Sequence, residues 1–336
     1  MTDEQPHTSP PQFPPPPDSG PFAFPPPPEP GRPNPNSSVR GFYPLDFDGI
    51  VRNSWSIFRF AWPTFLGAAI VPTLIVYAIA VPVQVAIWPE LSQWAAAYQA
   101  AIERGGVPTL PPIAPTSIAL LVLVGILSAF GAVVASAAVV SIGDSVFRGR
   151  PTTVRGALET GLRRLPGLIG AGLLFVLAVF GVALLGFTFG ALFVVGGGVA
   201  AFLGLVVIVA AMAAVFFIAI RWSLLIQTIV LEKAGPVEGL SRSWRLVAGS
   251  GWRVLGYFLF VALVSGVIGA VIGVLPEAIL RVSPASATGA ALGTIFQGLL
   301  TVLVAPVVLV MLFLYYDLRF KHGEPAPQPG EDRQAA

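Results

Sequence analysis

Long uncharged stretches alternate along the chain with short segments that hold most of its charged residues. Because about 20 consecutive apolar residues cross a bilayer as a helix, each long stretch predicts a transmembrane helix. Residues 45–320 are therefore expected to form one all-α integral membrane domain. Its six predicted spans are residues 61–88, 114–141, 168–190, 197–220, 254–276 and 292–316.

The third and fourth predicted spans share one uncharged stretch, between Arg164 and Arg221. As a single helix, these 56 residues would extend about 84 Å at 1.5 Å per residue, far beyond one crossing. The segment from Gly186–Gly190 through Gly196–Gly198 supplies the glycines for a turn. We therefore expect a helical hairpin here.

Basic segments that precede three of the spans resemble one another. Residues 47–70 and 236–259 each contain a Gly, an Arg three residues later, a Trp, a second Trp seven or eight residues further on, and then an apolar stretch. Residues 153–174 fit more loosely and contain no Trp. The spacing predicts three cytoplasmic amphipathic interfacial helices, and three repeated units of one such helix and two spans, with chance similarity as the alternative. The expected apolar faces are Phe47, Ile50, Val51, Trp55 and Phe58; Val154, Ala157, Leu158, Leu162 and Leu165; and Val237, Leu240, Trp244 and Val247.

A further helix is expected on the outer face of the membrane. Residues 89–106 place Leu91, Trp94, Tyr98 and Ile102 on one side of a helix. Within the spans, prolines are expected to bend the first helix, and pairs of small residues four apart are expected to allow close helix packing. These positions are Pro63, Pro72 and Pro82, and the pairs Gly186–Gly190, Gly269–Gly273 and Gly289–Gly293.

The two ends of the chain differ from the membrane domain. Residues 1–44 hold 16 of the 33 prolines, and few apolar residues, which predicts a disordered, extended cytoplasmic tail. A role as a ligand for domains that bind proline-rich segments is the alternative to a plain spacer. Residues 321–336 are also expected to be a disordered cytoplasmic tail, and the first ten residues lack the features of a cleavable signal.

Composition agrees with a lipid environment. The chain is 55% hydrophobic and 11% charged, with no Cys, and its mean hydropathy is +0.79; such a chain cannot cover itself with polar surface. The two alternating sets of non-membrane segments carry 17 and 2 of the Lys and Arg residues. The positive-inside rule therefore predicts that both termini lie in the cytoplasm. Arg outnumbers Lys 17 to 2, which is interpreted as the codon bias of a GC-rich bacterium, so the expected location is the bacterial inner membrane. Basic residues next to spans favour the bilayer and anionic lipid headgroups as partners, rather than nucleic acid.

Candidate chemistry is sparse. The two histidines, His7 and His322, are in the tails, and the predicted spans contain no Asp, Glu, Lys, Arg or His, which argues against a proton-driven pump. Asp46, Asp48 and Glu238 are interpreted as residues that start helices, with acid–base catalysis as the alternative. The remaining carboxylates near basic residues are interpreted as surface ion pairs: Asp144, Glu159 and Glu232. No catalytic, cofactor-binding or metal-binding residue is predicted.

Two motifs carry a resemblance to a known family. The stretch E-x-x-G-P-x-E-G-L-x-R-S-W-R at 232–245 and the Y-Y-D-L-R end at 315–319 resemble a bacterial, actinobacterial-type family of multi-pass membrane proteins. That family is similar to the membrane domain of glycerophosphoryl diester phosphodiesterases, and the resemblance is expected to cover most of 45–320. The chemistry of those enzymes lies in a separate soluble barrel, so the resemblance implies no catalytic residue here. The recurring positions would be Glu232, Gly235, Pro236, Arg242, Ser243, Trp244, Arg245, Tyr316, Asp317 and Arg319.

These observations favour a non-enzymatic membrane protein that acts as a scaffold or accessory subunit in envelope or lipid-related processes, with unidentified membrane proteins as possible partners. A passive transporter, channel or lipid-translocating protein is the alternative, and a membrane enzyme that uses Asp317 or Glu232 is a third. Asp317 and Arg319 are expected to pair with residues 236–249, through Arg242 or Arg245. The candidate motif and lipid-interface residues are Arg52, Trp55, Glu232, Pro236, Arg242, Trp244, Arg245, Trp252, Asp317 and Arg319.

Overall fold

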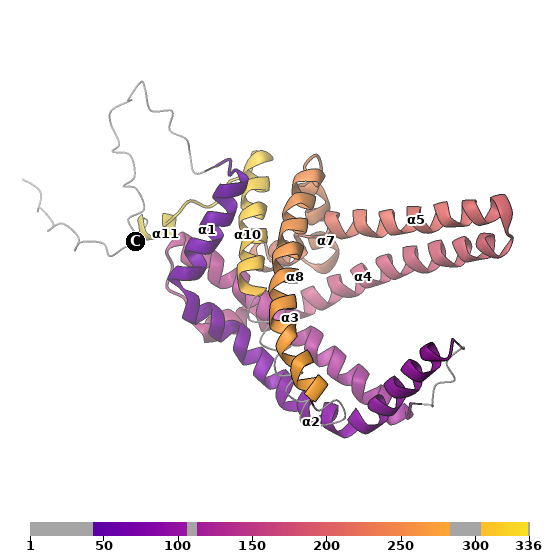
Figure 1. The fold of residues 1–336 in the computed structure, drawn as a ribbon. Coiled ribbons are helices and arrows are strands. Elements are labelled where there is room, and N and C mark those ends of the chain that lie inside the picture. The colour runs from indigo at the N-terminus through magenta and orange to yellow at the C-terminus, as the bar shows by residue number, and fades with distance from the viewer. Residues whose placement is uncertain (1–42, 106–112, 283–303, 335–336) are drawn as a thin grey trace, which may run out of the picture. The chain divides into compact units, whose positions relative to one another are not determined.

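The computed structural model describes residues 43–105, 113–282 and 304–334, with the backbone alone for 271–282, 304 and 333–334. The predicted proline-rich tail therefore lies outside the described residues, apart from Tyr43 and Pro44. Every regular element in the described residues is a helix, as predicted (Figure 1). The helices are α1 (Phe47–Phe60), α2 (Trp62–Glu103), α3 (Pro115–Arg148), α4 (Val154–Val195), α5 (Gly198–Arg221), α6 (Leu225–Leu231), α7 (Pro236–Val247), α8 (Gly251–Val282), α10 (Val304–Lys321) and α11 (Glu331–Gln334).

Five helical segments in the described residues are long and apolar enough to cross a membrane. They coincide with the first five predicted spans and lie in α2, α3, α4, α5 together with α6, and α8. The predicted sixth span, 292–316, falls partly outside the described residues, and α10 contains its second part. The described residues thus contain five candidate membrane spans, as expected for a multi-pass membrane protein, while the count of six stays a prediction.

Residues 89–103 are helical, as predicted, but they form the end of α2, which continues without a break from Trp62 to Glu103, rather than a further helix. Pro72, Pro82 and Pro89 all lie inside it, and its ribbon changes direction along its length in Figure 1. Proline is tolerated in an apolar helix where neighbouring groups satisfy the freed carbonyls. The local sequence pattern therefore predicted helix at residues 89–103 but did not show that this helix is continuous with the first span.

The α4–α5 hairpin is present, but its turn is shorter than the predicted turn region. Gly186–Gly190 remains helical, and the chain reverses at Gly196–Gly198, where Gly197 and Gly198 have φ values of 67° and 53° that favour glycine. Gly186 and Gly190 instead permit close packing: a Cβ built on Gly186 would lie 2.0 Å from the Ala211 Cβ.

Only two of the three predicted amphipathic segments are separate helices. Residues 154–165 are the first turns of the 42-residue α4, which Thr153 caps by accepting from the Gly156 N–H at 3.2 Å. α1 and α7 are separate and bury part of the expected faces, including Ile50 and Leu240. Ser54, Ile57, Ser243 and Leu246 are also buried, whereas Phe47, Trp55, Val237 and Trp244 are exposed. The repeat itself stays a prediction.

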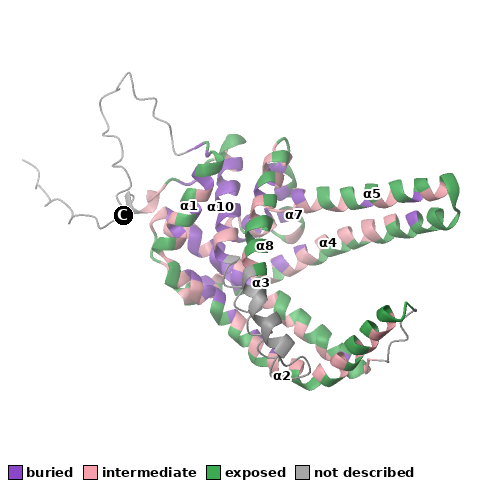
Figure 2. Ribbon diagram, in the orientation of Figure 1, coloured by how far each residue is buried: buried purple, intermediate pink, exposed green. Residues whose placement is uncertain are grey.

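The core surrounds α10. Residues Leu312 to Asp317 are all fully buried, and α10 packs against α1, α2, α3, α6, α7 and α8. In Figure 2 its ribbon is mostly purple, the colour of buried residues, whereas α4 and α5 are mostly pink and green. An apolar helix that is buried all round cannot show an amphipathic stripe. It positions the two polar clusters described next.

Candidate functional site

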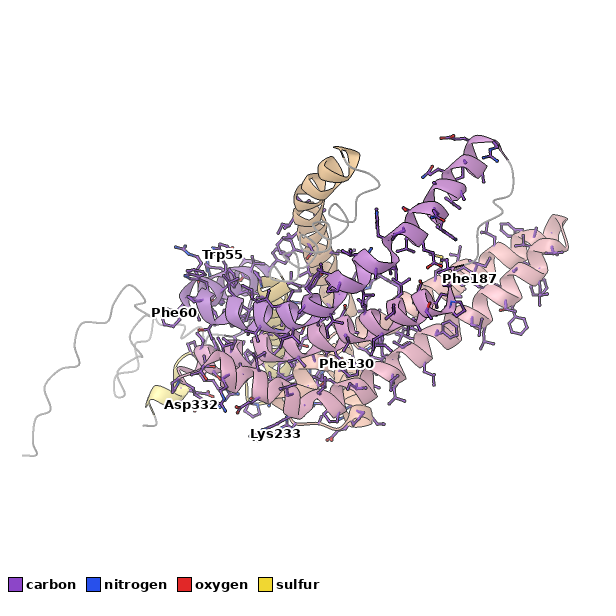
Figure 3. All side chains as sticks on the ribbon, turned by 90° about the horizontal axis from the view of Figure 1, so that it is seen from below. Trp55, Phe60, Phe130, Phe187, Lys233 and Asp332 are labelled. Atoms are coloured by element: carbon purple, nitrogen blue, oxygen red, sulfur yellow. The ribbon has the colours of Figure 1, made fainter. Side chains whose placement is uncertain are left out.

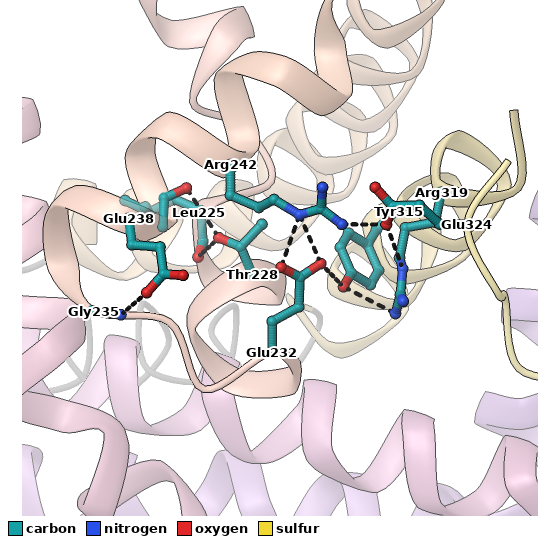
Figure 4. Close-up of polar contacts among 10 residues, drawn as sticks. Leu225, Thr228, Glu232, Gly235, Glu238, Arg242, Tyr315, Arg319 and Glu324 are labelled. Atoms are coloured by element: carbon teal, nitrogen blue, oxygen red, sulfur yellow. Dashed lines mark hydrogen bonds and ion pairs between the residues drawn. The ribbon is translucent and has the colours of Figure 1, made fainter. Parts of the chain in front are cut away.

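Glu232 lies at the centre of a polar cluster, the Glu232 cluster, at the junction of α6, α7 and α10 (Figure 4). Arg242 of α7 donates from Nε to Glu232 Oε2 at 2.8 Å, and the Tyr315 hydroxyl donates to Oε1 at 2.7 Å. Arg242 also pairs with Glu324, beyond the end of α10, and Arg319 approaches the same Glu324 carboxylate at 3.3 Å. Two motif arginines thus share one carboxylate, which joins the E-x-x-G-P motif to the Y-Y-D-L-R motif.

Charge pairing shifts the protonation equilibria in this cluster. The hydrogen bond from Arg242 lowers the pKa of Glu324 below its ordinary value, against the opposing effect of partial burial. The hydrogen bond to Glu324 and the nearby Glu232 raise the pKa of Arg242. Both groups therefore stay charged at neutral pH and act as a fixed ion pair.

The junction of α6 and α7 depends on small motif residues whose partners the sequence does not show. The buried Ser243 hydroxyl donates to the Arg221 carbonyl at 2.9 Å and accepts from the Leu224 N–H at 3.3 Å. A Cβ on Gly239 would lie 2.7 Å from Ile229, so glycine lets the two helices approach closely. Pro236 occupies the first turn of α7, as expected from the interpretation of this segment as a helix start.

The carboxylates cap helices or form ion pairs, as interpreted from the sequence, although Asp144 and Glu232 are largely buried rather than on the surface. Asp46 accepts from the Gly49 N–H at 2.7 Å and caps α1, and Glu238 accepts from the Gly235 N–H at 3.4 Å. Asp48, Asp144, Glu159 and Glu232 all form ion pairs with arginine. Among the described residues, no group of three or more acidic or histidine side chains could hold a metal ion.

Asp317 forms a second cluster, the Asp317 cluster, with partners that differ from the predicted ones. The carboxylate is fully buried; Oδ1 accepts from the Leu45 N–H at 2.7 Å, and the Arg253 guanidinium lies 2.9 Å from Oδ2. The Oδ2 contact is an ion pair without hydrogen-bond alignment. Lys321 lies farther away, 3.9 Å from Oδ2. The predicted pairing of Asp317 with Arg242 or Arg245 is wrong, because Asp317 lies two residues from both Tyr315 and Arg319 and therefore on the opposite side of α10 from the Glu232 cluster.

Residues 322–334, the C-terminal segment, lie against the bundle, where the sequence predicts a disordered tail. The Tyr43 hydroxyl donates to the Pro327 carbonyl at 3.0 Å, and the Gly330 N–H donates to the Phe147 carbonyl at 2.9 Å. Two ion pairs at 2.5 Å, Arg148–Glu331 and Arg150–Asp332, hold α11 at the end of α3. The arginines at the end of α3 and the carboxylates of α11 are far apart in the sequence, so they can pair only after the C-terminal segment has folded back onto α3.

The remaining candidate residues lie on the surface. Arg52 forms an exposed ion pair with Asp48, and Arg245 is exposed in the last turn of α7. Trp55 and Trp252 are 53% and 88% exposed, and Figure 3 labels Trp55 beside Phe60, which is equally exposed. Trp244 packs near Trp222, beneath the Arg221 guanidinium. Exposed tryptophans near span ends are typical of the membrane–water interface.

A groove of about 550 Å³ opens beside the Asp317 cluster. Its walls are the segment 44–47, the first two turns of α8 and the end of α10, including Arg253, Tyr257 and Lys321. The sequence analysis did not identify it, since its walls come from three segments that are far apart in the chain.

Acidification should release the C-terminal segment from the Glu232 cluster. The folded pKa of Glu324 lies below its unfolded value of about 4.3, so its contribution to stability is present above that pH and is lost as pH falls through the folded pKa. We expect wild-type protein to melt at a higher temperature than Glu324→Gln at pH 7, and the difference to shrink below about pH 4. Melting curves in detergent from pH 7 to pH 3 test this.

Glu159→Gln is the matched control, because Glu159 pairs with a 90% exposed Arg155 and should change the melting temperature little. A difference between wild type and Glu324→Gln that is constant down to pH 3 would contradict the prediction.

The comparison with known proteins agrees with the motifs over part of the chain. Residues 193–328, which include α5, α6, α7, α8 and α10, match the family described as the membrane domain of glycerophosphoryl diester phosphodiesterase. The match is shorter than the expected 45–320. No curated protein and no solved structure matches the chain. Over residues 193–328, this chain is therefore similar to the membrane domain of glycerophosphoryl diester phosphodiesterase.

Proposed function

We propose that this chain is an integral membrane protein without enzymatic activity of its own, which acts as a scaffold or accessory subunit in envelope or lipid-related processes. The observation that carries the proposal is that the charged residues of its two motifs form ion pairs within the protein. Glu232, Arg242, Asp317 and Arg319 all form ion pairs that link helices within the bundle.

A catalytic carboxylate needs a face that a substrate can reach. Asp317 has no exposed side-chain surface, and both of its oxygens have partners, Leu45 and Arg253. Glu232 is held by Arg242 and by the Tyr315 hydroxyl. Such pairing is typical of residues that fix helix positions, which supports a structural role for the two motifs.

We further propose that the protein lies in the bacterial inner membrane, crosses it six times and keeps both termini in the cytoplasm. Contacts between segments far apart in sequence support this topology, because residues that touch outside the spans must lie on one side of the membrane. Arg148 at the end of α3 contacts Glu331, and Asp317 near the end of α10 contacts Leu45 before α1 and Arg253 at the start of α8. These segments are among those that carry 17 of the 19 Lys and Arg residues.

Purification in a mild detergent after mild cross-linking tests the role. We expect one or more membrane proteins to co-purify in fixed ratio with wild type, and to be lost when exposed surface residues such as Trp55 and Arg245 are changed to Ala and Glu. An unrelated multi-span protein, purified identically, controls for non-specific carry-over. The purified protein in liposomes should not hydrolyse glycerophosphodiesters or phospholipids.

Two results would overturn the scaffold role. Hydrolysis by the reconstituted protein that is lost in Glu232→Gln would assign an enzyme. Exchange of labelled phospholipid between leaflets at a rate well above that of empty liposomes would instead assign a lipid-translocating protein.

A further inference from the structure

The groove beside the Asp317 cluster is open on one side and aromatic on the other. On the α8 side it contains Gly256, where an added Cβ would meet no atom within 4 Å. The adjacent Tyr257 is buried and stacks on Phe47, with ring centroids 5.0 Å apart. Phe47 remains 48% exposed. The groove thus has an aromatic wall and an open floor at Gly256.

Two cations stand at one end of the groove. Arg253 is held in place by the Asp317 carboxylate and by a hydrogen bond to the Leu45 carbonyl. Lys321 is held more loosely, at 3.9 Å from Asp317, and 36% of its side chain is exposed. The exposed carboxylate of the lining, Asp46, uses one oxygen to cap α1. Lys321 is therefore the charge best able to meet an incoming anion, since an ammonium binds phosphate as a point charge.

Beyond the groove, α8 has an exposed apolar face on the same side as Gly256. Leu259 and Leu263 follow Gly256 at helical spacing and are 54% and 67% exposed. A soluble anion would leave this face uncovered, whereas an amphiphile would place its anion near Lys321 and its chain along Leu259 and Leu263. In the membrane, the abundant molecule with that combination is a phospholipid.

We propose that the groove between the segment 44–47, α8 and the end of α10 binds one membrane phospholipid, with its phosphate near Lys321 and Arg253 and an acyl chain along Gly256, Leu259 and Leu263. The site lies on the proposed cytoplasmic side and holds a lipid at the point where the first amphipathic helix meets the bundle. This binding does not depend on the scaffold role, because a chain without partner proteins would still hold the lipid.

Native mass spectrometry of the full chain, purified with added phosphatidylglycerol, tests the proposal. Wild type should retain one lipid through detergent removal. Gly256→Leu fills the floor of the groove and should abolish this retention. Lys321→Gln should weaken it about fivefold, as expected for the loss of one cation near a lipid phosphate.

Gly181→Leu on α4 is the control, because a Cβ at Gly181 also meets nothing within 4 Å but α4 contributes no residue to the groove. It should retain lipid as wild type does, and equal melting temperatures show that the variants are folded. Equal retention by Gly256→Leu and wild type, or an unchanged affinity in Lys321→Gln, would overturn the proposal. Displacement of the lipid by soluble glycerol phosphate at equal concentration would also overturn the proposal. It would show that the acyl chain of the lipid contributes nothing to binding.

Discussion

Asp317→Ala is expected to destabilise the protein by about 3–5 kcal/mol, as for the removal of one partner of a buried ion pair. The substitution leaves the Leu45 N–H without its acceptor and Arg253 without its counter-ion. Because Asp317 connects α10 with the start of α1 and the start of α8, the segment 43–47 should also become sensitive to proteases. Unfolding in mixed detergent and SDS, with limited proteolysis, measures both effects.

Asp48→Ala is the control, because the Asp48–Arg52 pair is about 70% exposed on both sides and should contribute roughly 0.5 kcal/mol or less. Double-mutant cycles add a sharper test. Asp317→Ala should couple with Arg253→Ala by about 1–3 kcal/mol and should not couple measurably with Arg242→Ala. Coupling to Arg242 and none to Arg253 would show that the described pairing is wrong.

Gly204→Leu is expected to separate α4 from α5. A Cβ at Gly204 would lie 2.4 Å from the Gly190 carbonyl oxygen and 2.8 Å from the Val194 nitrogen. Both are backbone atoms, which cannot move aside as a flexible side chain can. Forcing a side chain into such packing costs about 1–3 kcal/mol or more, and unfolding in SDS should show the loss.

Gly181→Leu provides the comparison within the same hairpin. A Cβ at Gly181 meets nothing within 4 Å, so a leucine there should face lipid and change the unfolding free energy by about 0.5 kcal/mol or less. If both substitutions had the same small effect, the close α4–α5 contact would not exist in the membrane.

The spans could be predicted from the sequence because the bilayer imposes a simple requirement. A helix satisfies its own backbone hydrogen bonds, and its length in lipid follows from its apolar residues. That requirement places one apolar span in each of α2, α3, α4, α5 and α8, and it gives both ends of α5 to within one residue. It does not say whether a helix continues beyond the membrane, so the continuation of α2 to Glu103 and of α4 back to Val154 was not predicted.

The sequence predicted several residues of the candidate site but not which of them contact one another. The motifs identified Glu232, Arg242, Asp317 and Arg319 as residues of interest. The sequence also predicted that Asp46 and Pro236 lie at the starts of helices, which the structure confirms. Tyr315, Glu324 and Arg253 were not singled out as their partners, because each contact joins residues more than 60 positions apart or depends on the direction of α10.

The sequence by itself determined a helical membrane protein, the approximate spans and the segments that carry its charge, because hydropathy and helix geometry act locally. Only the tertiary structure decided which arginine meets which carboxylate, that residues 322–334 lie against α3, and that α10 forms the core. Each of these depends on the rotation and depth of one helix relative to another. Those are set by side-chain packing, such as Gly239 against Ile229, which no local pattern encodes.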